Sequence, residues 1–226
     1  MRNLIDECRD VAQTLKSVFD LEMESYINDK HTHEFDGWSD WFWRSDKIRK
    51  AHLKTIEPAG KNRKQWLLHM NIFPDADIDA PVFGLDIVAT PNKISGVFCD
   101  FSPTTDTQDE FLDLFKEITK TLEWKREREL PPWAQEIFTE EMIAAGSVRQ
   151  GPETDQLILA VGILTKTYFN MINQLKPDPE LNTIQAQNKY CFFQKQNKML
   201  HSSILAWGIS EEDKDDYVND VLFEEI

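Results

Sequence analysis

The sequence predicts an α+β fold in which helices cover an antiparallel sheet. Helical periodicity marks the N-terminus, four strand-like segments form the middle of the chain, and helical patterns return in the C-terminal half. The connections between successive strand-like segments are short, and short connections require antiparallel pairing. The 226 residues, with 41% hydrophobic and 29% charged side chains, have an ordinary globular composition. We therefore expect a single domain covering residues 1–226.

The N-terminal segment is expected to be an amphipathic helix. Apolar residues recur at spacings of three and four between Leu4 and Phe19, which places them on one helix face. Residues 27–37 are polar and are predicted to form a loop. The aromatic cluster that follows is expected to pack in the core, and it comprises Trp38, Trp41, Phe42 and Trp43.

Four segments in the middle of the chain have the pattern of strands, and they cover residues 51–58, 65–73, 82–89 and 94–101. Gly and Asn flanked by charged residues at positions 60–64 are typical of a turn. The first two strands are therefore expected to form a hairpin.

Helices are expected in most of the remaining chain, at residues 110–124, 154–175, 183–207 and 216–223. Pro177 and Pro179 end the second of these helices, and Gly208 is placed to cap the third. Residues 137–148 show no clear periodicity and stay unassigned.

Composition and charge disfavour several classes of function. A net charge of −15 disfavours non-specific binding to nucleic acid or anionic lipid. No apolar run approaches the roughly 20 residues of a membrane-spanning helix, and the N-terminus lacks the pattern of a signal peptide. The odd number of cysteines, Cys8, Cys99 and Cys191, argues against a disulfide framework. We expect a cytoplasmic protein with no membrane or nucleic-acid partner.

Motifs of nucleotide, zinc and serine-nucleophile chemistry are absent from the sequence. It contains no glycine-rich phosphate loop, no HExxH and no serine elbow. His31 and His33 lie in a polar loop without a nearby thiol, and two histidines alone do not close a metal site. We therefore predict no metal.

Basic residues are concentrated between Arg44 and Lys64. This segment has eight basic and two acidic residues, so its net charge is +6 in a strongly acidic chain. It is either a docking site for an acidic partner or an ordinary solvated hairpin, and the charge pattern favours neither.

Ionisable side chains lie inside three of the apolar segments, at His69, Asp86 and Asp100. Because burying such groups is costly unless they are paired, we expect His69 and Asp86, on successive strands, to pair or to act chemically. The alternatives are a structural core histidine and carboxylates satisfied by backbone N–H groups at a strand end or turn.

Eight short motifs between residues 48 and 223 together resemble those of the ferredoxin-dependent bilin reductases, and are most similar to the phycocyanobilin:ferredoxin oxidoreductase branch. In order they are Ile48-Arg49-Lys50-Ala51-His52-Leu53, Leu67-Leu68-His69 with Phe73-Pro74, residues 81–89, Asp100-Phe101-Ser102-Pro103, residues 128–133, Tyr190-Cys191 with Gln194, Asn197-Lys198, and Trp207-Gly208 with residues 217–223.

This resemblance implies a three-layer α/β/α sandwich with a central antiparallel sheet. Biliverdin is expected between the sheet and the C-terminal helices. Family members use no metal or flavin, so we expect no bound cofactor. Reduced ferredoxin supplies single electrons from outside, and the protein supplies protons to bilin radicals.

The resemblance also assigns roles to individual residues. Asp86 matches the principal proton donor, and His69 matches the histidine paired with it. The family has a glutamate on the strand that holds His52. Here either Glu57 or Lys54 matches that position, and Glu57 is the available acid.

The C-terminal motif departs from the family pattern, because Asn197 stands where the family often has an aspartate. Asn cannot donate a carboxylic proton, so the catalytic role of this position needs another donor. Lys198 is expected to bind a propionate, and Phe83 and Gln194 are expected at the substrate. The basic segment is expected to steer an acidic ferredoxin through Lys47, Lys50, Lys61, Arg63 and Lys64.

The function expected from this resemblance is ferredoxin-dependent reduction of biliverdin IXα to phycocyanobilin by a monomeric enzyme. A two-electron reductase that stops at 15,16-dihydrobiliverdin is the first alternative, because of Asn197. A non-catalytic bilin carrier is the second. Asp86 and His69 argue against a carrier, since binding alone needs no proton donor.

Overall fold

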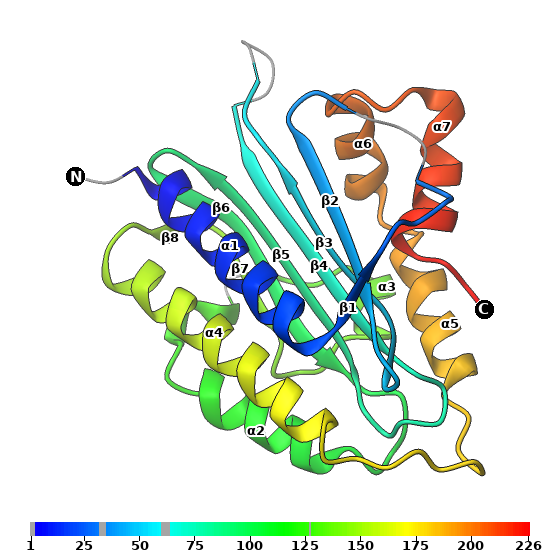
Figure 1. Ribbon diagram of the computed structural model, residues 1–226. Coiled ribbons are helices and arrows are strands. Elements are labelled where there is room, and N and C mark those ends of the chain that lie inside the picture. Colours follow the sequence, from blue (N-terminus) through cyan, green and yellow to red (C-terminus); the bar gives the residue numbers. More distant parts are fainter. Residues whose placement is uncertain (1–2, 32–34, 60–63, 127) are drawn as a thin grey trace.

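The computed structural model describes residues 3–31, 35–59, 64–126 and 128–226. Within these ranges an antiparallel sheet of eight strands forms the centre of the molecule (Figure 1). The strand order is β1-β2-β3-β4-β5-β6-β7, and β8 also pairs with β6. The strands are β1 (Glu24–Tyr26), β2 (Trp38–Arg44), β3 (Ile48–Ile56), β4 (Trp66–Pro74), β5 (Val82–Thr90), β6 (Lys93–Ser102), β7 (Ile143–Ala145) and β8 (Val148–Arg149).

Helices cover both faces of this sheet, which confirms the expected α/β/α sandwich (Figure 1). One face carries α1 (Leu4–Glu22), α2 (Asp109–Thr119) and α4 (Pro152–Ile172). The other face carries α3 (Pro132–Gln135), α5 (Ile184–Gln194), α6 (Lys198–Ala206), α7 (Glu211–Asp216) and the π-helical segment η2 (Tyr217–Leu222). A short 3₁₀ helix, η1 (Glu123–Arg126), follows α2. No helix among the described residues has the length and apolar character needed to cross a bilayer.

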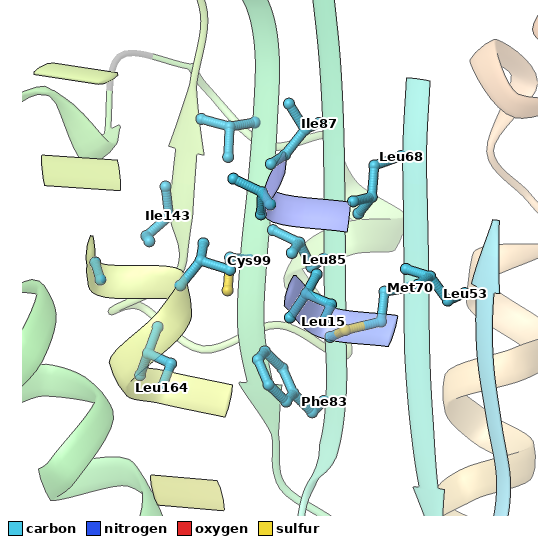
Figure 2. Packing of buried hydrophobic residues seen from close by; sticks show 14 of the residues in the cluster. Leu15, Leu53, Leu68, Met70, Phe83, Leu85, Ile87, Cys99, Ile143 and Leu164 are labelled. Carbon is cyan, nitrogen blue, oxygen red and sulfur yellow. The ribbon is translucent and has the colours of Figure 1, made fainter. Parts of the chain in front are cut away.

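The alternation of side chains along the strands separates two chemically different faces. Leu68 and Met70 of β4 and Leu85 and Ile87 of β5 lie in one apolar cluster with Leu15 of α1 (Figure 2). Successive strand residues point to opposite faces. The residues between these apolar side chains therefore point toward the C-terminal helices.

Strand register aligns four ionisable residues across the face that the C-terminal helices cover. Asp40 of β2 is opposite Lys54 of β3, Lys54 is opposite His69 of β4, and His69 is opposite Asp86 of β5. We call these four residues the ionisable row. Side chains that are directly opposite in antiparallel strands have Cβ atoms only about 5 Å apart.

The next row on the same face is formed by His52, Asn71, Gly84 and Asp100. Gly84 allows the hydroxyl of Tyr190, from α5, to approach the sheet. A Cβ atom at position 84 would lie only 2.9 Å from that oxygen. This glycine thus sets the distance between α5 and the sheet.

Several elements differ from the sequence prediction. The aromatic cluster of residues 38–43 forms strand β2, and the unassigned segment 137–148 contributes β7. The helix expected over residues 183–207 is two helices, because the Asn197 side chain accepts hydrogen bonds from the backbone N–H groups of Met199 and Leu200. Such a cap begins a new helix at that point.

Replacing Gly84 by Ala is expected to destabilise the protein by about 1–3 kcal/mol, since the added methyl group forces Tyr190 away from the sheet. Urea unfolding measures this change. The matched control is Gly162→Ala in α4, where the added Cβ meets no atom within 4 Å, so stability is expected to stay equal or rise by up to about 1 kcal/mol. Equal effects of the two substitutions would contradict this role of Gly84.

Candidate functional site

A cavity of about 440 Å³ opens between β5, β6 and the C-terminal half of the chain. Its wall is largely apolar and aromatic, with a few polar groups, as is typical of pockets for organic ligands. Phe98, Trp133, Phe138 and Trp207 contribute rings, and Asp86, Arg128 and Gln194 contribute polar groups.

The carboxyl group of Asp86 lies in the cavity wall. It is hydrogen-bonded to His69, which does not line the cavity. The Asp86 Oδ1 to His69 Nδ1 distance is 2.7 Å, and the two residues face each other across β4 and β5. The Asp86 side chain is 42% exposed, whereas that of His69 is 12% exposed. The predicted pairing is therefore present, and a hydrogen bond to the imidazole holds the carboxyl at the cavity.

Asn71 fixes the other nitrogen of the His69 ring. Its side-chain nitrogen lies 3.2 Å from His69 Nε2, and the same nitrogen also donates to the carbonyl of Leu222 in η2. With this amide donating to Nε2, the imidazole proton lies on Nδ1 and is donated to Asp86. The ring is thereby oriented for proton transfer toward the cavity.

A second polar cluster lies beside this pair and is almost completely buried. The carboxylate of Asp40 accepts hydrogen bonds from Tyr217 (3.2 Å), and it lies 2.6 Å from His52 Nε2 and 3.9 Å from Lys54 Nζ. It also lies 3.3 Å from His31 Nε2. Lys54 donates to the Tyr217 hydroxyl.

Burial and charge shift the protonation equilibria of this cluster in opposite directions. Burial lowers the pKa of Lys54 to about 7 and that of His52 to about 3, although the Asp40 charge opposes both changes. Burial alone would raise the pKa of Asp40, but Lys54 and hydrogen bonds from His31 and His52 hold it well below its usual value. Asp40 is therefore ionised at neutral pH.

Arg128 is the cationic group of the cavity wall, and the sequence analysis did not single it out. Its Nη2 donates to the carbonyl of Ser95 (2.7 Å), and its guanidinium lies 5.5 Å from the ring centroid of Phe98. A Cβ atom at Gly146 would lie within 2.9 Å of this guanidinium. A guanidinium held in this way suits a carboxylate ligand. The sequence signal that could have identified Arg128 is its position at the start of the motif at residues 128–133.

The structure places Phe83, which was expected at the substrate, away from the cavity wall. Phe83 is fully buried on the opposite face of the sheet, beside Leu85 and Met70 (Figure 2). Its ring contacts those of Phe101 and Tyr168. It is three residues from Asp86, and an odd separation along a strand reverses the face.

Glu57 is also on the wrong face for a catalytic acid. Its carboxylate accepts hydrogen bonds from Arg9 of α1 (2.6 Å to Nη2) and from the indole of Trp66 (3.1 Å). Lys54 is the residue of β3 opposite His69. Lys54, and not Glu57, therefore shares the face of His69, and Lys54 carries no acid.

The predicted C-terminal site residues divide into two groups. Gln194 and Asn197 line the cavity, and Gln194 donates a hydrogen bond to Tyr190 (2.9 Å). The Asn197 oxygen is occupied by the backbone of α6. Lys198 is exposed and is not part of the cavity wall.

The described lysines of the basic segment do not share one surface. Lys61 and Arg63 lie outside the described residues. Lys50 is buried and donates to the carbonyl of Val221, and burial lowers its pKa to about 8. Lys47 donates to the carbonyl of Asn173, and Lys64 is exposed at the opposite end of the β3–β4 hairpin. A nine-residue strand separates these ends by about 30 Å.

Asp100 attaches the outer wall of the cavity to β6. Its carboxylate accepts hydrogen bonds from the hydroxyl (2.5 Å) and backbone N–H (3.0 Å) of Thr139 and from Ser102 (3.0 Å). Thr139 directly follows Phe138, which lines the cavity. Burial raises the pKa of Asp100 to about 6, although these hydrogen bonds oppose the rise. The residue is thus structural, as its position before a turn suggested.

Comparison with known proteins places this geometry in a family context. A family model described as "Ferredoxin-dependent bilin reductase" matches residues 3–224. A phycocyanobilin:ferredoxin oxidoreductase of Prochlorococcus marinus strain MIT 9515 is 28% identical over 222 residues, which cover 94% of this chain and 87% of that protein. The corresponding protein of strain MIT 9313 is 32% identical over 183 residues, covering 79% and 67%.

Solved structures share the fold. The crystal structure of phytochromobilin synthase from tomato in complex with biliverdin superposes with a TM-score of 0.76 at 16% identity, and the match covers 95% of this chain and 82% of that one. Within the described ranges, no group of three or more His, Cys, Asp or Glu side chains is arranged to hold a metal ion.

Replacing Asp100 by Asn is expected to flatten the pH dependence of stability. The folded-state pKa of about 6 exceeds the unfolded value of 3.8. The stabilisation from the protonated carboxyl is complete below pH 3.8 and is lost as the pH rises through 6. Relative to Asp100→Asn, the wild type should lose about 2 kcal/mol between pH 4 and 7. Urea unfolding across this range measures the difference, and parallel curves would contradict it.

Proposed function

The chain belongs to the ferredoxin-dependent bilin reductase family, and we propose that it reduces biliverdin IXα to phycocyanobilin with single electrons from ferredoxin. The observation that carries this proposal is the carboxyl of Asp86 at the wall of the cavity, hydrogen-bonded at 2.7 Å to His69. Reduction of a conjugated pigment by single electrons creates radicals that must be protonated. A carboxyl group that faces a ligand cavity and is held by an imidazole is suited to donate that proton.

The cavity matches the chemistry of a linear tetrapyrrole. Such a pigment is mostly apolar and carries two propionate groups. Rings of Phe98, Trp133 and Trp207 line the apolar part of the wall. The Arg128 guanidinium is the group that we assign to one propionate. Lys198, exposed next to the cavity residue Asn197, is the partner that we assign to the other.

A two-electron reductase that forms 15,16-dihydrobiliverdin is the second candidate, and a specific observation favours it. The Asn197 side chain caps α6 and donates no acid proton, and Glu57 lies on the other face of the sheet. Asp86 and Glu129 are the carboxyl groups among the residues that line the cavity. The four-electron product therefore requires Asp86 to be used repeatedly or Glu129 to assist.

The setting that we propose for this reaction is a reducing cytoplasm, with the protein as a monomer. Cys8, Cys99 and Cys191 are all free and buried. Burial raises the pKa of the Cys8 thiol to about 12 and that of Cys191 to about 11, so neither is a reactive thiolate. Free, buried thiols of this kind are typical of proteins in a reducing compartment, and they support the proposed setting.

Anaerobic incubation with biliverdin and a reducing ferredoxin system, followed by chromatography of the bilins, tests the function. We expect phycocyanobilin from the wild type. The Asp86→Asn variant should bind biliverdin within a factor of about three of the wild type but lose at least 100-fold in turnover and accumulate a radical, because an amide cannot donate the proton. Dihydrobiliverdin as the end product would favour the second candidate. Binding without conversion, or full turnover by the variant, would contradict the proposal.

Ferredoxin docking is proposed at the cavity end of the β3–β4 hairpin. Lys64 is exposed there and directly precedes Gln65, which lines the cavity. Single-electron transfer needs a short distance between donor and pigment, and a lysine at the cavity mouth attracts an acidic partner. Lys47, at the far end of the hairpin, is not placed for this role.

Lys64→Gln is expected to raise the KM for ferredoxin by about two- to fivefold at low salt, and the effect should disappear at about 0.5 M salt because the interaction is screened. Lys47→Gln, the same charge change at the other end of the strand, should leave KM within error of the wild type. Ionic-strength series for both variants measure this. Equal effects of the two substitutions, or no salt dependence, would refute docking at Lys64.

A further inference from the structure

A second hollow lies beside the cavity, and one side chain forms the boundary between the two spaces. This side hollow has a volume of about 230 Å³, and it is enclosed by the start of β5, the end of β6, residues 136–139 and one face of α5. Among the described residues, Phe138 is the one that lines both the cavity and the side hollow. The position of this aromatic ring therefore determines where the cavity ends.

The ring of Phe138 is held between two other aromatic rings. Its centroid lies 6.2 Å from that of Trp133, which lines the cavity, and 6.1 Å from that of Tyr190, which lines the side hollow. Both contacts are edge-to-face, a geometry that aromatic pairs favour. Phe138 is thus fixed as a partition, with one ring on either side of it.

The backbone around Phe138 is anchored to the sheet. The Phe138 N–H donates to the carbonyl of Ala134 (3.0 Å). The next residue, Thr139, donates its hydroxyl (2.5 Å) and its N–H (3.0 Å) to the carboxylate of Asp100, which is buried on β6. A side chain supported in this way keeps its position when a ligand presses against it.

The partition is close to the carboxyl group that faces the cavity. The Tyr190 hydroxyl accepts a hydrogen bond from Gln194 (2.9 Å), a cavity residue, and it lies against Gly84. Gly84 and Asp86 are two residues apart on β5, so they point to the same face with Cα atoms about 7 Å apart. The boundary at Phe138 and Tyr190 is therefore near enough to limit how a ligand lies against Asp86.

Position along the cavity decides the outcome of the proposed reaction. In each step the pigment gains one electron from reduced ferredoxin and one proton from Asp86, a C–H bond forms, and Asp86 becomes a carboxylate. A proton donor must lie within about 2.6–3.2 Å of the atom that it protonates. A linear tetrapyrrole has several unsaturated carbons, so the carbon that lies against Asp86 is the one reduced.

We propose that Phe138 is a specificity-determining residue whose ring stops the pigment at the end of the cavity and so selects the carbon that Asp86 protonates. This inference rests on the proposed function, because it concerns the regiochemistry of that reaction. The side hollow is the space that the pigment enters when the ring is removed. Val82, Pro103 and Ile137 give that hollow apolar walls, which suit a pyrrole ring.

Chromatography of the bilins formed from biliverdin and a reducing ferredoxin system tests this role. In Phe138→Ala the two spaces are joined, so the ratio of the wild-type product to other reduced isomers should fall about tenfold. Phe138→Leu, which keeps part of the partition, should give an intermediate ratio. The matched control is Ile137→Ala, because Ile137 is buried and lines the side hollow but not the cavity. This control should keep the wild-type ratio.

Urea unfolding of each variant separates a change of product from a loss of fold, and Phe138→Leu alone carries the test if the alanine variant does not fold. The wild-type product ratio in the folded Phe138 variants would overturn the inference. An equal change in Ile137→Ala would show general loosening of the wall and would also overturn it. If the wild type does not reduce biliverdin, the proposed function itself fails. The role of Phe138 alone fails when the wild type turns over and the Phe138 variants keep its product.

Discussion

The antiparallel register between β4 and β5 is the constraint on which the rest of this site depends. It sets His69 directly opposite Asp86 on the same face of the sheet. A slip of one residue would move one partner to the opposite face, into the apolar core between the sheet and α1. The hydrophobic pattern on that core face fixes the register, because Leu68, Leu85 and their neighbours must be buried together. Packing of the apolar core on one face of the sheet therefore positions His69 and Asp86 on the other face.

The two faces of the sheet divide stability from function. The face under α1, α2 and α4 is apolar and closely packed. The face under the C-terminal helices carries the ionisable row and the neighbouring row of His52, Asn71, Gly84 and Asp100, most of which are buried. Those groups cost stability, and the dense core opposite offsets that cost. The arrangement resembles other enzymes in which a rigid scaffold holds perturbed titratable groups beside a cavity.

Much of the fold follows from periodicity alone. The amphipathic helix at the N-terminus, the four central strands and the long helix near residue 160 all carry strong patterns, and all are present. The failures have physical causes. The aromatic residues of β2 were interpreted as core packing, because they lack the alternation of a strand. The N-cap at Asn197 divides residues 183–207 into two helices, although their periodicity predicts one continuous helix. Alternation along the chain already places Phe83 and Glu57 on the opposite face, because Phe83 is three residues from Asp86 and Glu57 is three residues from Lys54.

The sequence by itself determined the four central strands, that His69 and Asp86 should pair, and which family of enzymes the chain resembles, because these depend on local pattern and on short motifs. Tertiary structure alone decided that Arg128 joins the cavity wall, that Lys50 is buried, and that Asp40, His52 and His31 gather beside His69. These groups come from segments far apart in the chain. Their meeting is fixed by strand order and helix packing, which no local pattern encodes.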